Sequence, residues 1–220
     1  MPEAVLFDLD GTLADTAPDL GAALNRVRQD YDLPPLPLAP LRPHTSQGGR
    51  GLLRVGMGVT PQDDSYAELY RRFIQHYEER LCHHTTLFPG MAELLAQLEQ
   101  RCIPWGVVTN KSERLTHPLL QQMDLAHRCA CIVCGDSTPN PKPAPDPLLL
   151  AAQLLGLPPP QDCCYLGDDL RDIQAGNACA MMTIGVRWGY LGTERPPETW
   201  GADHLIDHPD EVSPLLRPTR

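Results

Sequence analysis

Short apolar runs separated by amphipathic stretches recur along the chain. The five runs cover residues 4–7, 105–109, 131–133, 163–166 and 181–184. A short apolar run that ends in turn residues is typical of a strand whose two faces are both covered in a parallel sheet. Between the first two runs, Met91, Leu94, Leu95 and Leu98 have the spacing of one helix face. Strands that alternate with helices predict an α/β fold, a doubly wound parallel sheet built from right-handed βαβ units.

One long stretch interrupts this alternation. From about residue 16 to residue 84 the pattern is helical and contains no convincing central strand. One helix should include Leu20, Leu24, Val27 and Tyr31 on a single face. A second helix is predicted for residues 66–81. The Pro-rich segment 33–43 and the Gly-rich segment 47–58 lie between the two helices.

The simplest organisation is a helical domain inserted after the first strand. We predict a helical cap domain at residues 16–85 and an α/β core formed by residues 1–15 and 86–220. The chain should return to the core through a hinge near residues 85–89.

Composition and charge narrow the function classes. Apolar residues make up 42% and charged residues 21%, which supports a buried core and argues against disorder. The net charge of −10 argues against nucleic acid or an anionic membrane as a partner. An anionic substrate is still compatible, because a metal ion and local cations can reverse the sign inside a pocket. The chain lacks a membrane-length apolar stretch and a secretion-signal pattern at its start, so we expect a cytoplasmic location.

The eight cysteines do not have the spacing of a metal site. Cys129, Cys131 and Cys134 match neither a zinc knuckle nor a pair of CxxC motifs. We interpret them as small apolar residues near a buried strand.

Polar residues follow several of the predicted strands. In an open parallel sheet, ligands bind beyond the carboxyl ends of the strands, so side chains from different segments should meet at one rim. The candidates are Asp8, Asp10, Thr109, Asn110, Lys142, Asp168, Asp169 and Asp172.

Such a group of carboxylates would favour binding of a metal ion. Three or four carboxylates in a small volume repel one another unless a cation lies among them, and oxygen-only ligands favour Mg²⁺. Lys142 and the Thr109 hydroxyl would suit phosphate oxygens. One of Asp8 and Asp10 could attack while the other handles a proton. The alternative is structural, with the first pair in a turn and Asp168-Asp169 at a helix N-terminus.

The four segments resemble the ordered motifs of the haloacid dehalogenase superfamily. They are Asp8-Leu9-Asp10-Gly11-Thr12, Val108-Thr109-Asn110, Lys142-Pro143 and Gly167-Asp168-Asp169-Leu170-Arg171-Asp172. The resemblance implies a phosphatase that passes through an aspartyl-phosphate, with Asp8 as the nucleophile and Asp10 as the general acid and then base.

The same resemblance assigns the remaining motif residues. Thr109, with Asn110 beside it, would bind the phosphoryl group, and Lys142 would neutralise both nucleophile and phosphate. Asp8, Asp168 and the main-chain carbonyl of Asp10 would hold Mg²⁺. Asp169 and Asp172 would either bind the Mg²⁺ ion or orient the residues that bind it directly. The second aspartate, Asp10, separates phosphatases from the dehalogenases of the superfamily.

Two other functions share parts of this pattern. A receiver-like signalling module also gathers acids, a hydroxyl and a lysine around Mg²⁺, but its phosphorylated aspartate follows a middle strand and no helical cap is inserted. A sugar phosphomutase of the β-phosphoglucomutase type would use the same Asp8 and Asp10. The Gly167-Asp168-Asp169 form favours hydrolysis over the mutase.

Substrate choice should depend on the cap domain. The loop His44-Thr45-Ser46-Gln47-Gly48-Gly49-Arg50 is polar and carries a cation. Arg50, with His44 or Ser46, could bind a carboxylate or hydroxyl of the leaving group, or it could be a solvated residue at a helix start.

Three segments are more particular: Trp105-Gly106-Val107-Val108-Thr109-Asn110-Lys111, Gly167-Asp168-Asp169-Leu170-Arg171-Asp172-Ile173 and Trp188-Gly189-Tyr190. With them the chain resembles, within the superfamily, the phosphoglycolate phosphatase group. That group includes N-acetylmuramic acid 6-phosphate phosphatases, and the expected partner is a small phosphorylated metabolite that also bears a carboxylate.

Trp188 and Tyr190 could cover the pocket or pack beneath the cap. The sequence indicates no particular oligomeric state.

Overall fold

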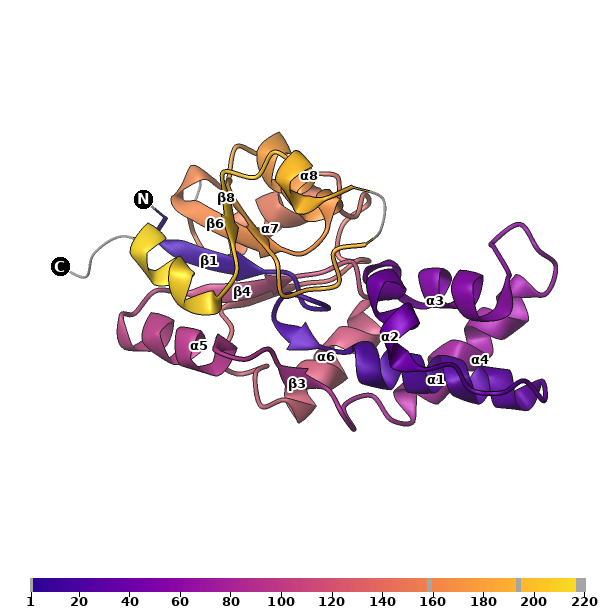
Figure 1. Ribbon diagram of the computed structural model, residues 1–220. Coiled ribbons are helices and arrows are strands. Elements are labelled where there is room, and N and C mark those ends of the chain that lie inside the picture. Colours follow the sequence, from indigo (N-terminus) through magenta and orange to yellow (C-terminus); the bar gives the residue numbers. More distant parts are fainter. Residues whose placement is uncertain (1, 158–159, 193–194, 217–220) are drawn as a thin grey trace.

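Six parallel strands form the central sheet, in the order β5-β4-β1-β6-β7-β8 (Figure 1). The structure is a computed structural model that describes residues 2–157, 160–192 and 195–216. The strands are β1 (Ala4–Phe7), β4 (Trp105–Val108), β5 (Cys131–Val133), β6 (Cys163–Gly167), β7 (Met182–Val186) and β8 (His204–Ile206). Each predicted apolar run forms a strand of this sheet, so the predicted α/β fold is confirmed.

Helices cover both faces of the sheet (Figure 1). They are α5 (Met91–Gln100), α6 (Glu113–Gln122), α7 (Asp146–Leu154) and α8 (Leu170–Ala178). Successive side chains of a strand point to opposite faces. Val5 and Phe7 of β1 accordingly pack in a cluster with residues of α5 and α6, whereas Ala4 and Leu6 pack with α7 and α8. Both faces of β1 are buried, which explains why its sequence is apolar at every position.

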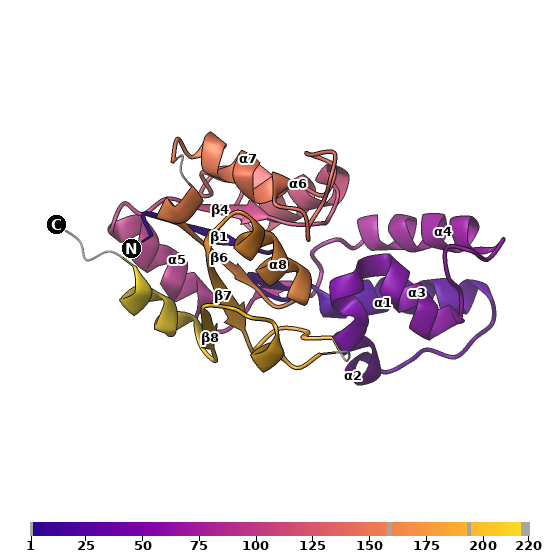
Figure 2. The same cartoon turned by 90° about the horizontal axis from the view of Figure 1, so that it is seen from above.

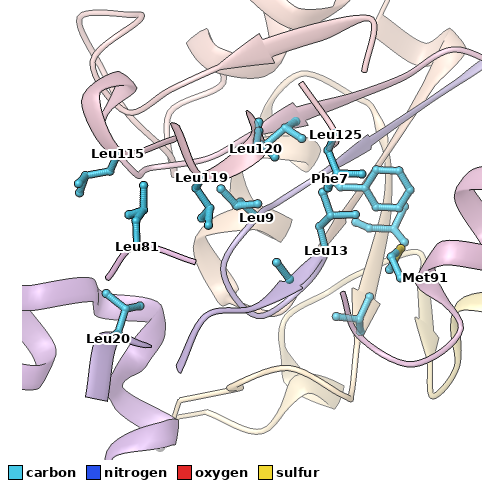
Figure 3. Close-up of a cluster of buried hydrophobic side chains, with 14 of the residues drawn as sticks. Phe7, Leu9, Leu13, Leu20, Leu81, Met91, Leu115, Leu119, Leu120 and Leu125 are labelled. Carbon is cyan, nitrogen blue, oxygen red and sulfur yellow. The ribbon is translucent and has the colours of Figure 1, made fainter. Parts of the chain in front are cut away.

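The larger of the two buried clusters continues from the sheet into the helical part of the chain. Figure 3 shows Phe7 and Leu9 beside residues of α6, with Leu115 near Leu81 and Leu20 at the other end. Burial of apolar side chains contributes about 25 cal/mol for each Å² removed from water. The helical segment is therefore held against the sheet partly by the same hydrophobic cluster that stabilises the core.

Residues 16–85 form helices at the carboxyl end of β1, away from the N-terminus (Figures 1 and 2). The helices are α1 (Ala17–Asp30), α2 (Leu38–Leu41), α3 (Gly48–Met57) and α4 (Tyr66–Glu78), with a 3-10 helix at Arg42–Gln47. At the base of this segment, β2 (Ala14–Asp15) pairs antiparallel with β3 (Thr86–Leu87). The entering and returning chains therefore lie side by side.

Two details differ from the sequence-based expectation. Tyr31 ends α1 and is 45% exposed, so it does not share the buried face of Leu20 and Leu24. The Gly-rich segment 47–58, which lies between the two predicted helices, itself contains α3, as in the alternative that placed Arg50 at a helix start. A Cβ atom at Gly56 would lie 2.5 Å from a carbon of Leu24, and one at Gly49 would lie 2.8 Å from the ring of Phe73. These glycines allow α3 to approach α1 and α4 closely.

A tyrosine from the core stabilises the start of α1. The first N–H groups of a helix have no partner within the helix. The Tyr190 hydroxyl accepts hydrogen bonds from the N–H groups of Thr16 and Ala17, both at 2.8 Å, and lies 3.1 Å from Asp15 Oδ1. Tyr190 is buried, which agrees with packing beneath the helical segment.

We therefore expect Tyr190→Phe to destabilise the fold. Two main-chain N–H groups lose their acceptor, and an unsatisfied buried donor costs about 1–3 kcal/mol. The free energy of unfolding, measured by urea denaturation, should fall by about that amount. Tyr70→Phe is the matched control, because the Tyr70 side chain is 38% exposed. Equal losses in the two variants would contradict this role of Tyr190.

The returning chain has its own anchor on α1. The Asp19 carboxylate is buried and accepts hydrogen bonds from the N–H groups of His84 and Thr85, at 2.9 and 2.8 Å, and from the Thr85 hydroxyl at 2.8 Å. Both connections between the helical segment and the sheet are thus held by buried polar contacts.

The cysteines and the helices also bear on whether the chain has a cysteine metal site or a membrane span. All eight cysteines are free, and five of them are buried. Among the described residues, the group that could hold a metal consists of aspartates and contains no cysteine. Within the same part of the chain, each helix is too short or too polar to cross a bilayer.

Candidate active site

The strand order brings the two acidic motifs together. The chain first builds the side of the sheet with β4 and β5 and then returns to add β6 on the other side of β1. Ligands of such sheets bind at this reversal point, beyond the carboxyl ends of the strands. Asp8 directly follows β1 and Asp168 directly follows β6. With Asp172, they offer carboxylate oxygens that all lie within 4.8 Å of one another.

Lys142 connects two of these carboxylates. Its Nζ atom lies 2.9 Å from Asp8 Oδ1 and 2.7 Å from Asp172 Oδ1. It also donates to the Tyr165 hydroxyl at 2.7 Å and to the Val108 carbonyl at 3.1 Å. Burial alone would lower the pKa of this lysine, but Asp172 and Asp8 raise it, so Lys142 is charged. Burial raises the pKa of Asp8 to about 7, although Lys142 opposes the shift.

Asp168 lies deepest of the acidic residues. It is fully buried and accepts hydrogen bonds from the Thr12 hydroxyl at 3.0 Å and from the Tyr190 N–H at 2.8 Å. Burial, followed by the charges of Asp8 and Asp172, raises its pKa well above the usual value. Gly11 has a φ of +95°, and a Cβ there would lie 2.2 Å from the Asp168 carboxylate. Glycine therefore permits the close approach of the first loop to this acid.

The donor set fits a hard divalent cation. Asp8, Asp168 and Asp172 carry three carboxylates, and Lys142 supplies one nearby positive charge. Burial raises the pKa of both Asp8 and Asp168, and the neighbouring carboxylates raise it further. A cation between the carboxylates would remove the repulsion, and an oxygen-only set matches Mg²⁺ or Ca²⁺.

Asp169 and Asp172 also organise the start of α8. Asp169 precedes the helix and its carboxylate accepts from the Arg171 N–H at 2.9 Å, while Asp172 Oδ2 accepts from the Asp169 N–H at 3.1 Å. This reciprocal pair is a capping box. Burial opposes ionisation of Asp169, but the Arg171 guanidinium holds the pKa of Asp169 below its usual value. Asp169 thus caps α8, while Asp168 belongs to the acidic cluster.

Asp10 is held by a lysine that the sequence analysis did not single out. Lys111 Nζ lies 2.9 Å and 3.1 Å from the two Asp10 oxygens, and the Thr16 hydroxyl donates to Oδ1 at 2.6 Å. The Lys111 ammonium also lies 4.7 Å from the ring centre of Tyr77 in α4. Only two of the 18 basic residues are lysines, and the side chains of both are largely covered here. That rarity is a signal that the sequence contained.

Thr109 and Asn110 follow β4 at the same rim. Thr109 is buried, and its hydroxyl accepts from the Lys111 N–H at 3.2 Å. The Asn110 side chain donates to the Lys142 carbonyl at 2.9 Å and accepts from the Lys142 N–H at 3.0 Å. Asn110 therefore positions the main chain of Lys142.

These side chains surround one cavity between the sheet and the helical segment. Its volume is about 380 Å³, and its walls include Asp8, Asp10, Thr109, Asn110, Lys142, Asp169 and Asp172. Asp168 lies behind this wall. The opposite wall comes from α3 and α4, with Arg50 in the first turn of α3 and the stacked rings of Tyr66 and Tyr70 in α4, whose centres are 5.7 Å apart. The sequence analysis missed this aromatic wall.

Comparison with known proteins places the chain in a family. Residues 5–186 match the family described as haloacid dehalogenase-like hydrolase. An N-acetylmuramic acid 6-phosphate phosphatase of Pseudomonas putida is 41% identical over 213 residues, which cover 97% of this chain and 95% of that protein. A phosphoglycolate phosphatase of Xanthomonas campestris pv. campestris is 41% identical over 211 residues, with 96% and 95% covered.

Solved structures agree with this relationship. A crystal structure from Haemophilus somnus, described as a predicted phosphoglycolate phosphatase, superposes with a TM-score of 0.85 at 26% sequence identity and covers 97% of each chain. The predicted relationship is therefore confirmed: the chain belongs to the haloacid dehalogenase-like hydrolase family and is a phosphatase within it.

Proposed function

We propose that this phosphatase hydrolyses a small phosphomonoester through an aspartyl-phosphate on Asp8, with Mg²⁺ as its cofactor. The observation that carries the proposal is the position of Asp8. Its carboxylate lies on the wall of the cavity, beside the charged Lys142 and within the acidic cluster. A carboxylate that attacks a phosphate dianion needs such positive charge, because the two reactants repel each other.

Hydrolysis would proceed in two displacements. An Asp8 oxygen bonds to phosphorus while the ester P–O bond breaks, and Asp10 gives its proton to the departing alkoxide. A water molecule then attacks the same phosphorus, Asp10 takes a proton from it, and the bond to Asp8 breaks to release phosphate. One residue can serve both steps because the first leaves Asp10 deprotonated. The position of Asp10 on the cavity wall supports this role, and the contact with the Lys111 ammonium favours the carboxylate that acts as base in the second step.

The other motif residues would stabilise the negative charge that develops on the phosphoryl group during the reaction. Lys142 and Thr109 would contact phosphoryl oxygens, with Asn110 fixing the main chain of Lys142. Asp8, Asp168 and the main-chain carbonyl of Asp10 would hold Mg²⁺, and Asp169 and Asp172 would orient this set. The bound cation would supply positive charge that offsets the carboxylates and the incoming phosphate.

The helical segment would act as a cap. We propose residues 16–85 as the cap domain and residues 1–15 and 86–220 as the core. The β2–β3 pair at the boundary and the cavity between the two parts support this division. A cap that closes over the cavity would exclude water from the first displacement.

The substrate would combine a phosphate with a carboxylate. The two relatives described above are named for N-acetylmuramic acid 6-phosphate and phosphoglycolate, and both molecules have this combination. Arg50 on the cavity wall would bind the carboxylate, and the Tyr66–Tyr70 wall favours the larger, ring-bearing molecule. The eight free cysteines are compatible with a reducing compartment, and we propose a cytoplasmic location.

A phosphate-release screen tests this function. We expect the protein with Mg²⁺ to release phosphate from p-nitrophenyl phosphate, and to act best on N-acetylmuramic acid 6-phosphate or 2-phosphoglycolate among metabolite monophosphates. Neither the mutase nor the receiver alternative is favoured. Conversion of glucose 1-phosphate to its isomer without phosphate release, in the presence of a bisphosphate primer, would contradict hydrolysis, as would one labelling event without turnover.

A further inference from the structure

A second hollow adjoins the candidate active site and is lined by four arginines. It has a volume of about 390 Å³, and we call it the arginine hollow. Arg50 and Arg54 come from α3, Arg171 from α8 and Arg195 from the chain after β7. Figure 2 shows that the chain after β7 extends from the sheet toward the helices of the cap. The hollow is thus formed jointly by the core and the cap.

The positive charge of the arginine hollow is poorly compensated. Among the described residues that line it, Asp169 is the acidic one. Arg171 already binds both Asp169 oxygens, with Nε 2.8 Å from Oδ1 and a terminal nitrogen 3.0 Å from Oδ2. Arg54 donates to the neutral side chain of Gln47 at 3.1 Å. Three guanidinium groups therefore remain without a carboxylate among the described lining residues.

This surplus of positive charge in the arginine hollow differs from the rest of the molecule. The chain carries a net charge of −10, and many of its other arginines lie in ion pairs. Examples are Arg26–Glu79, Arg114–Glu78, Arg128–Glu99 and Arg187–Glu198. Guanidinium groups that line one hollow without a carboxylate partner in the described part of the chain favour an oxyanion, because their planar N–H donors match carboxylate and phosphate oxygens.

The arginine hollow adjoins the site where phosphate would bind, with shared side chains between them. Gln47, Arg50, Asp169 and Arg171 line both the hollow and the cavity that contains Asp8. A molecule with its phosphate at Asp8 would have to extend past Arg50 to reach the hollow. Building on the proposed function, we infer that the arginine hollow binds a second anionic group of the substrate, separated from the phosphate by a spacer of about sugar size.

Two matched sugars test this inference. N-acetylmuramic acid 6-phosphate and N-acetylglucosamine 6-phosphate share the ring and the phosphate, but only the first has a carboxylate. We expect the wild type to have a kcat/KM about tenfold higher for the acid, the effect of one charge-assisted hydrogen bond. In Arg54→Gln this ratio should fall toward one, mainly through KM for the acid. Arg128→Gln, with a paired arginine elsewhere on the core, is the matched control and should keep the ratio.

The outcomes separate this inference from the proposed function. Failure of the wild type to hydrolyse even p-nitrophenyl phosphate would refute the function itself. Hydrolysis of p-nitrophenyl phosphate but of neither sugar, or a sugar ratio that is the same in the wild type and Arg54→Gln, would overturn the inference alone. A wild-type ratio near one, together with sulfate inhibition that is lost in Arg54→Gln, would also overturn it, because the hollow would then bind a separate oxyanion.

Discussion

Asp8→Asn should abolish turnover of every phosphomonoester, with a loss of at least about 10³-fold in kcat. The amide is nearly isosteric with the carboxylate but cannot form the bond to phosphorus. Lys142 keeps a counter-charge, because it also binds Asp172 at 2.7 Å. Steady-state release of p-nitrophenol measures the effect.

Two controls distinguish this loss from unfolding or loss of metal. Burial raises the pKa of Asp8 to about 7, which means that the fold disfavours the charged carboxylate, so the free energy of unfolding should not fall when this charge is removed. A wild type stripped of divalent cations should also lose activity, but Mg²⁺ should restore it, whereas Mg²⁺ should not restore Asp8→Asn. Residual activity near the wild-type level would refute Asp8 as the nucleophile.

Asp10→Asn should lower kcat by about 10²–10⁴-fold for alkyl phosphates, the usual contribution of general acid–base catalysis. The first step loses the acid that protonates the alkoxide, and the second loses the base that activates water. p-Nitrophenolate leaves without a proton, so with p-nitrophenyl phosphate the first step should survive. Rapid mixing should then show a burst of p-nitrophenol, followed by a stall. Equal losses for both substrate types, without a burst, would contradict this role.

The control for Asp10→Asn must restore the charge balance around Lys111. The Lys111 side chain is largely covered, and its ammonium pairs with Asp10. Removing one partner of a fully buried pair costs about 3–5 kcal/mol, and this pair, which lines the cavity, should lose part of that amount. The double variant Asp10→Asn/Lys111→Met removes both charges and should regain much of that stability without regaining activity. Recovery of turnover in the double variant would show that the single change acts only through folding.

Much of the fold was predictable because a strand that is buried on both faces of the sheet has an apolar residue at each position. Residues 4–7 and 163–166 are apolar at each position, and both form central strands. Helix α3 was not predictable from propensity, since glycine weakens an isolated helix. Its glycines instead meet Leu24 and Phe73, and these contacts exist only after α1 and α4 have packed.

Some residues of the candidate site could likewise be predicted from the sequence, whereas others depend on how the helices pack. The strand-end rule brings Asp8 and Asp168 together without any knowledge of packing, and their carboxylates do lie within 4.8 Å. Lys111 follows the motif Thr109-Asn110, but its contact with Tyr77 depends on where α4 lies. The arginine hollow likewise combines residues from α3, α8 and the chain after β7, which no spacing relates. The catalytic roles themselves stay predictions.

The most direct test is to locate the phosphoryl group on the protein. Asp10→Asn should be mixed with p-nitrophenyl phosphate and Mg²⁺, quenched in acid during the stall, digested and analysed by mass spectrometry. We predict that the N-terminal peptide gains the mass of one phosphoryl group, that fragmentation places it on Asp8, and that Asp8→Asn never gains it. A phosphoryl group on another residue, or a burst with no phosphorylated peptide, would contradict the account.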